Sequence, residues 1–159
     1  MFFYLAEMEK DISKADFLDA IHKRVRNGIS KASIILEGIQ ESIDSETQST
    51  AGDKHDTSRE LMQQERNKAA QNLQNQISLD RLIHKLKTIS TSDEVGFGSL
   101  VLTNFGWFFI GLPSGKINFE DQEILCISGN APVAKILERK RVGASISVNG
   151  KNTQILSIK

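Results

Sequence analysis

Apolar residues in the first half of the chain recur at intervals of three and four positions. This spacing predicts a helix with the narrow a/d seam of a coiled coil. The seam residues are Leu18, Ile21, Val25, Ala32, Ile35 and Ile39. Gly28 occupies one seam position, where it either weakens the helix or permits the close approach of a partner.

A second segment with similar but weaker spacing follows. Its apolar positions are Met62, Ala69, Leu73, Ile77, Leu82 or Ile83, and Leu86. So thin an apolar stripe cannot form the core of a globule, and the outer faces are rich in Gln and Asn. The two segments together predict an antiparallel helical hairpin, with arms of about 30 residues, or roughly 45 Å each. We expect His22 and His84 to lie on its surface.

The apolar period stops between the two segments, over residues 45–56. Gly52 favours a turn there, and residues 57–60 form a Ser/Thr-x-x-Glu capping box. We therefore expect the second helix to begin around Thr57, with Asp53 and Asp56 just outside its N-terminus at the tip, near 51–56. Acids at this place also have a purely structural explanation, because the helix macrodipole favours them.

The second half of the chain has the residues of a sheet. After Phe17 no aromatic residue occurs until Phe97, and β-branched runs then alternate with glycine-containing turns. Strands are expected at 98–103, 107–111, 123–127, 144–148 and 153–158, and a short helix at 132–137. Asn149-Gly150 is a strong hairpin signal. The fold class is α+β in two domains: residues 1–90 form a coiled-coil hairpin, and residues 93–159 form a small antiparallel sheet with one short helix.

The last hairpin alternates in polarity, which predicts the side chains that face the core. They are Ile146 and Val148 on one strand, and Ile155, or Leu156 with Ile158, on the other. Trp107, Phe108 and Phe109 are most simply core residues, although alternation points one face of their strand outward.

Composition excludes several classes of protein. The 159 residues contain 20 basic and 20 acidic residues, so no global field favours nucleic acid or membrane. The single cysteine, Cys126, rules out an internal disulfide framework and lies in an apolar run, where a packed side chain is expected. No apolar run approaches the about 20 residues of a membrane span. We expect a cytoplasmic protein.

Two motifs resemble the Gre family of bacterial transcription elongation factors. One is the stretch from Ile127 to Leu137, followed by Lys140-Arg141-Val142-Gly143 and the final hairpin. The other is Gly52-Asp53 with Asp56 three positions later. The resemblance implies an FKBP-like C-terminal domain that docks on RNA polymerase, probing its secondary channel with the hairpin. The expected partners are RNA polymerase and the RNA 3′ end within it, with no membrane, and the protein is expected to be a monomer.

The resemblance also implies metal-assisted cleavage of backtracked RNA by the polymerase itself, so the factor is not an enzyme. Asp53 would bind a second Mg²⁺ shared with the polymerase active site, and Asp56 would be a second ligand or orient the attacking water. The isolated protein is not expected to bind this ion tightly. The sequence departs from the family at Asp56, where glutamate is usual, and at Glu60, where an aromatic residue is common. Lys54 and His55 lie between the two acids.

Two alternative functions remain open at this point. A channel regulator would dock in the same way without promoting cleavage, and an FKBP-like chaperone or prolyl isomerase would use the sheet domain instead.

The role of the basic residues of the first helix is also open, because they either face RNA or form an ordinary solvated surface. These residues are Lys23, Arg24, Arg26 and Lys31.

Overall fold

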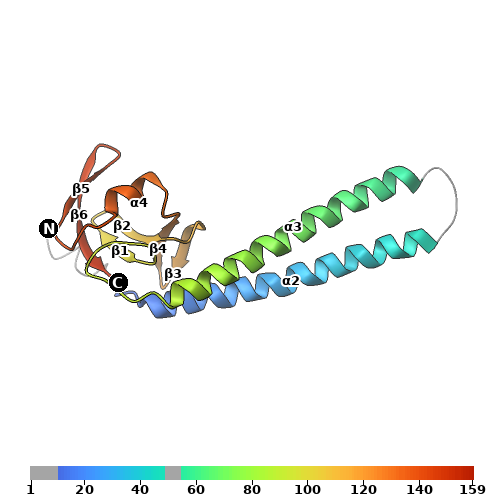
Figure 1. Cartoon of the computed structure of the whole chain (residues 1–159), viewed down its shortest axis with the longest axis horizontal. Helices are drawn as coiled ribbons and strands as arrows, with labels where there is room; N and C mark the ends of the chain where they lie inside the picture. Colours follow the sequence, from blue (N-terminus) through green and yellow to red (C-terminus); the bar gives the residue numbers. More distant parts are fainter. Residues whose placement is uncertain (1–10, 49–54) are drawn as a thin grey trace. The chain divides into compact units, whose positions relative to one another are not determined.

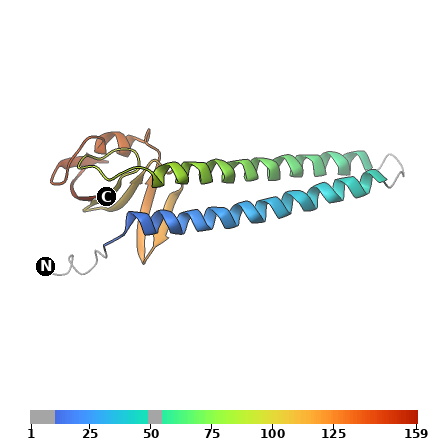
Figure 2. The same cartoon turned by 60° about the horizontal axis from the view of Figure 1, so that its bottom comes forward.

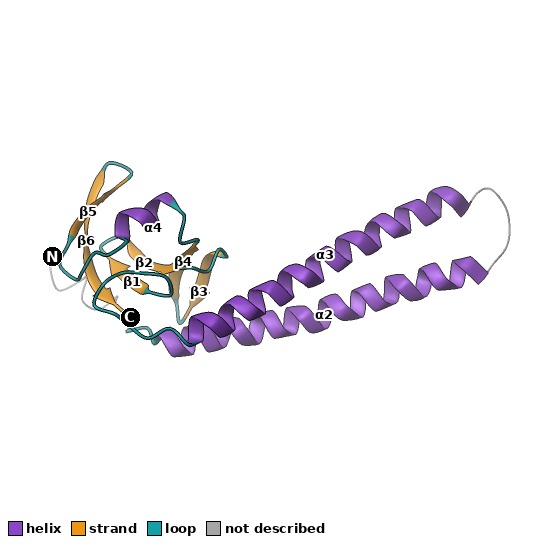
Figure 3. Ribbon diagram, in the orientation of Figure 1, coloured by secondary structure: helices purple, strands orange, loops and turns teal. Residues whose placement is uncertain are grey.

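A computed structural model describes residues 11–48 and 55–159 of the chain. The chain divides into two compact units, one made of Ala20–Leu82 and the other of the described residues up to Asp19 together with Ile83–Lys159. Figures 1 and 3 show two long helices, α2 (Lys14–Gln48) and α3 (His55–Lys87), followed by the strands of a sheet. In the described residues, no helix is long and apolar enough to span a bilayer.

The unit Ala20–Leu82 is a pair of antiparallel helices, which lie side by side in both views (Figures 1 and 2). Two cross-helix polar contacts, His22 with Asp80 and Gln40 with Arg66, set its register, and the side chain of Gln76 lies beside Gly28 between them. Residue numbers rise on α2 as they fall on α3, so the predicted antiparallel hairpin is confirmed.

The seam of this hairpin is narrow. Among the described residues of 20–82, the buried hydrophobic side chains are Ile21, Val25 and Ala32, all on α2. Ile35, predicted to lie in the seam, is 56% exposed, and Leu36 is half-buried in its place. A straight α-helix has 3.6 residues per turn, so its buried stripe drifts from a 3.5-residue repeat after a few turns. The prediction for Ile35 is wrong for this reason.

The sheet unit contains six strands among the described residues. They are β1 (Leu100–Thr103), β2 (Gly106–Ile110), β3 (Gly115–Phe119), β4 (Gln122–Ile127), β5 (Ser145–Val148) and β6 (Lys151–Ile158). Their order is β3-β4-β2-β1-β6-β5. The short helix α4 (Pro132–Leu137) begins at a proline, as predicted.

The α+β class is confirmed, but the sheet is mixed and not purely antiparallel. β2 pairs with β4 in parallel, because the chain forms β3 on the outside of β4 before β4 returns beside β2. The sequence pattern predicts no strand at 115–119. β3 is an edge strand with mostly exposed or half-buried residues, so it lacks the apolar alternation that marks a core strand.

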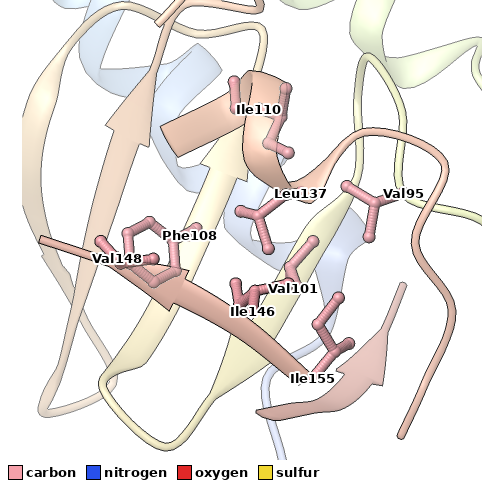
Figure 4. Packing of buried hydrophobic residues seen from close by; sticks show 9 residues of the cluster. Val95, Val101, Phe108, Ile110, Leu137, Ile146, Val148 and Ile155 are labelled. Carbon is pink, nitrogen blue, oxygen red and sulfur yellow. The ribbon is translucent and has the colours of Figure 1, made fainter. Parts of the chain in front are cut away.

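Both faces of the central strand β2 are covered. On one face, Phe108 and Ile110 join a core beneath α4 that includes Val101, Leu137 and Ile155 (Figure 4).

On the other face, Phe109 lies 5.5 Å, between ring centroids, from Phe17 in the first turn of α2. Phe17 also contacts Phe119 of β3 at 5.5 Å. Residues 107–110 are therefore all buried, and no outward aromatic face results.

The final hairpin forms as its sequence predicts. Asn149 and Gly150 both have positive φ, 51° and 76°, and Val148 pairs with Lys151 across them. This conformation matches the right-handed twist of the flanking strands. Ile146, Val148 and Ile155 are buried, while Leu156 is 37% exposed. Of the two alternatives for the last strand, Ile155 is therefore the residue that faces the core.

The Phe17 contacts predict a large stability effect. Phe17→Ala removes a ring that is 0% exposed and packs on two other rings, and it should lower the free energy of unfolding by about 3–5 kcal/mol. Phe105→Ala is the matched control, because Phe105 is 48% exposed and its loss should cost only about 1–2 kcal/mol. Urea unfolding followed by the fluorescence of Trp107, the single tryptophan, measures both; equal losses would contradict the packing role.

The two glycines of α2 offer a test of the hairpin packing. A Cβ on Gly38 would meet nothing within 4 Å, so Gly38→Ala should stabilise the hairpin by about 0.5–1 kcal/mol through helix propensity. A Cβ on Gly28 would stand 2.9 Å from Gln76 Oε1, at the end of a flexible side chain. Gly28→Ala should therefore stabilise less than Gly38→Ala. Thermal unfolding followed by circular dichroism compares the two, and a larger gain at Gly28 would contradict the close approach.

Candidate functional site

Of the predicted acidic pair, only Asp56 belongs to the residues that the structure describes. α2 ends at Gln48 and α3 begins at His55. Asp53 falls outside the described residues, and Asp56 is the second residue of α3. The helix thus begins two residues before the predicted start at Thr57, which places Asp56 in its first turn instead of outside it. An acid in the first turn is favoured by the helix macrodipole, and helix ends vary by one or two residues.

The register of the hairpin locates its centre. The residue numbers of the three cross-helix pairs average 51, 52 and 53, from the His22 pair to the Arg66 pair. The first and last contacts are short, 3.0 Å from His22 Nε2 to Asp80 Oδ1 and 2.6 Å from Arg66 Nε to Gln40 Oε1. In residue number, the midpoint of the pairing therefore falls at 51–53, which lies outside the described residues.

The sequence around this midpoint is strongly acidic, a feature that motif spacing does not reveal. Residues 41–60 contain six acidic and two basic residues, although the whole chain is neutral. Glu41 and Asp44 are exposed on α2, and the last turn of α2 contains no basic residue. A local excess of carboxylates raises the concentration of cations near this end of the hairpin. Counting charges in a short window of the sequence would have revealed this acidic segment.

The histidines lie differently from the prediction of two surface residues. His84 is exposed, as expected. The side chain of His22 is only 12% exposed and forms the contact with Asp80, because it faces α3 across the seam. The sequence gives no local signal for this contact, because Asp80 lies 58 residues further along the chain. Lys23, Arg24, Arg26 and Lys31 of α2 are exposed, as an interaction surface or a solvated face requires.

The sheet unit carries an open apolar hollow of about 360 Å³. It is lined by Phe105, Phe108, Leu125, Val133, Val148, Asn149 and Lys151. Two phenylalanines and two valines give it a hydrophobic floor, and Phe105 is 48% exposed at its rim. Such a surface is suited to contact with another protein.

Cys126 lies in β4 and is buried. Burial raises the pKa of its thiol to about 12, because the charged thiolate loses its hydration in the core. Its Sγ contacts the Ile124 carbonyl oxygen at 3.9 Å. The thiol is therefore protonated at neutral pH and serves as a packed side chain, as the sequence predicts.

These features define an α+β protein with an antiparallel helical hairpin, an acidic hairpin end and a six-stranded mixed sheet. No family model matches the chain, and no curated protein matches it. Among solved structures, the transcription factor Gfh1 aligns over 86% of this chain and 92% of its own length, with 15% sequence identity and a TM-score of 0.34. Neither the identity nor the score assigns an activity.

The raised pKa of Cys126 predicts low reactivity. At pH 8 the native thiol should react with a disulfide reagent about a thousandfold more slowly than an exposed cysteine, since only the thiolate attacks. Denaturation in urea should restore the ordinary rate. Absorbance of the released chromophore measures both rates, and rapid reaction of the native protein would show that Cys126 is accessible.

Proposed function

We propose that this protein is a Gre-type elongation factor that binds RNA polymerase, inserts its hairpin into the secondary channel and promotes cleavage of backtracked RNA. The observation that carries the proposal is the pairing of α2 and α3 about residues 51–53. In this proposal the Gly52-Asp53…Asp56 motif forms the end of the hairpin, which is supported by its position in the sequence between Gln48, the last residue of α2, and the start of α3. The 35 residues of α2 give a helix about 50 Å long, a length suited to reaching a buried active site.

The chemistry proposed for the hairpin end requires few protein ligands. Mg²⁺ binds through one or two carboxylates and keeps several waters, so Asp53 and Asp56 provide a partial site that the polymerase completes. When bound, the ion activates water and stabilises the leaving oxygen of the RNA phosphodiester. The acidic residues from Glu41 to Glu60 support this role, because they attract the cation without binding it tightly.

The sheet unit is proposed as the anchor on the polymerase. Its exposed apolar hollow gives a surface for protein contact, and Cys126 offers no reactive thiol for catalysis of its own. In this proposal the factor acts as a cytoplasmic monomer and supplies carboxylates to the polymerase, which performs the hydrolysis. A prolyl isomerase activity of the sheet unit stays an untested prediction.

A second candidate function keeps the docking and omits the cleavage. It is favoured by the sequence at the hairpin end, where Asp56 has a shorter side chain than glutamate and where Lys54 and His55 bring positive charge between the acids. Such a protein would occupy the channel and tune nucleotide entry.

Backtracked polymerase complexes distinguish the two functions. With millimolar Mg²⁺, the wild-type protein should shorten the labelled RNA, and Asp53→Asn should slow that reaction by about a hundredfold, because a direct ligand of the ion is lost. Asp56→Asn should slow it by about tenfold or more. Gel analysis of the RNA over time gives each rate.

Asp44→Asn is the matched control. It removes the same charge from the same end of the hairpin, on an exposed side chain of α2 whose Oδ1 accepts a hydrogen bond from Gln40. This variant should retain nearly full activity. Wild-type protein that binds polymerase without shortening RNA would establish the second candidate, and absence of binding would remove both.

A further inference from the structure

The charged residues of α2 are sorted by sign along the part of the helix that belongs to the hairpin unit. Residues 20–33 contain four basic and no acidic residues, and residues 34–48 contain four acidic and no basic residues. All of the basic residues and three of the acidic ones are exposed. The basic set is Lys23, Arg24, Arg26 and Lys31, and the acidic set is Glu37, Glu41, Asp44 and Glu46. The sign of the charge therefore reverses at Ile34.

Ile34 lies on the outward side of α2, away from α3. It is 68% exposed, the largest fraction among the exposed large hydrophobic side chains of the described residues, and the adjacent Ile35 is 56% exposed. Val25, nine residues or two and a half turns earlier, is buried in the seam, so helix geometry directs Ile34 to the opposite side. Lys23 and Glu41 lie 11 and 7 residues from Ile34, close to whole numbers of turns, and share its side. An exposed apolar residue thus separates a basic half of this face from an acidic half.

We propose that this face of α2 binds the same face of a second copy of the chain, with the two helices antiparallel and a two-fold axis beside Ile34. A face whose charge changes sign at its centre is complementary to itself when reversed, as a symmetric homodimer interface requires. Arg26 and Glu41 lie eight residues before and seven residues after Ile34, or about 12 Å and about 11 Å along the helix axis. Each therefore comes level with the other in the second copy, and Ile34 packs on its own counterpart.

Charge complementarity favours a second copy over other occupants of this face. The phosphates of a nucleic acid would be attracted to the basic half and repelled by the acidic half, and an anionic membrane surface would be treated in the same way. A second copy in the parallel orientation would bring like charges together. Antiparallel pairing of two copies matches both halves of the face at once and also removes Ile34 from water.

The dimer should be weak and sensitive to salt, because exposed ion pairs contribute little each and salt screens them. It goes beyond the function proposed above, for which a single hairpin is required. In relation to that function the dimer is a resting form, and its dissociation releases the monomer that acts.

Sedimentation equilibrium of the full chain, without polymerase, tests the interface. At low salt and protein concentrations up to about 1 mM, the average mass should rise from that of one chain toward that of two, and added salt should reverse the rise. Arg26→Glu should weaken association by about tenfold or more, because the two-fold axis then brings acidic side chains together twice. Ile34→Gln should weaken it by about threefold or more, because the apolar contact is lost.

A charge swap tests the register of the two copies. Glu41→Arg alone should weaken association, whereas Arg26→Glu combined with Glu41→Arg should restore it to within about threefold of the wild type, because opposite charges again face each other. Glu65→Arg is the matched control, since it makes the same change of charge at an exposed position of α3, and it should associate like the wild type. Circular dichroism confirms that each variant is folded.

Three results would each overturn the proposal: a wild type that stays monomeric at low salt, a charge swap that does not restore association, and equal weakening by Glu65→Arg. The sedimentation experiment contains no polymerase and no RNA, so its failure is distinguishable from failure of the cleavage assay.

Discussion

The pairing of α2 with α3 through a narrow seam is the interaction on which the rest of the structure depends. In the described part of 20–82 the buried hydrophobic side chains of this seam are Ile21, Val25 and Ala32, an apolar area too small to hold two long helices firmly by itself. Polar contacts occupy the positions between, where Gln40 accepts a hydrogen bond from Arg66 and His22 meets Asp80. Such contacts specify register more than they add stability, because a shifted pairing would leave half-buried polar groups without partners.

The register of the two helices also determines which residues stand at the end of the hairpin. A slip of one helical turn would move the centre of pairing by about two residues along the chain and change which residues stand at the end. The close approach of Gln76 to Gly28 strengthens the same register, since a larger side chain at position 28 would displace Gln76. A seam that is weak in apolar contact but specific in polar contact is therefore consistent with a hairpin that must present particular residues.

In the sheet unit, the central strand β2 has apolar side chains on both faces, and each face must be covered. The two faces of β2 are covered by unlike elements: α4 lies over Phe108, and the first turn of α2 brings Phe17 onto Phe109. The start of α2 thus serves as part of the core of the sheet unit. Ion pairing of Lys87 with Asp19, at 2.7 Å, joins the ends of the two helices within that same unit.

How much of this could be predicted from the sequence depended on whether the cause was local. Asn149-Gly150 determines its own turn through positive φ, and the three-four spacing determines the hairpin, so both were predictable. The parallel pairing of β2 with β4 and the edge strand β3 depend on contacts between distant segments, for which one sequence holds no local signal. The exposure of Ile35 depends on accumulated drift between helix and seam, which a fixed repeat ignores.

The same distinction between local and long-range causes applies to the polar residues of the hairpin. The acidic motif was found because three residues stand close together in the sequence, whereas His22 and Asp80 are 58 positions apart and meet only once the register is known. Two carboxylates this close in the sequence are suited to a hard, weakly held ion, for which a partner must supply the remaining ligands. A short acidic motif therefore predicts part of a metal site, and the rest depends on a protein outside this chain.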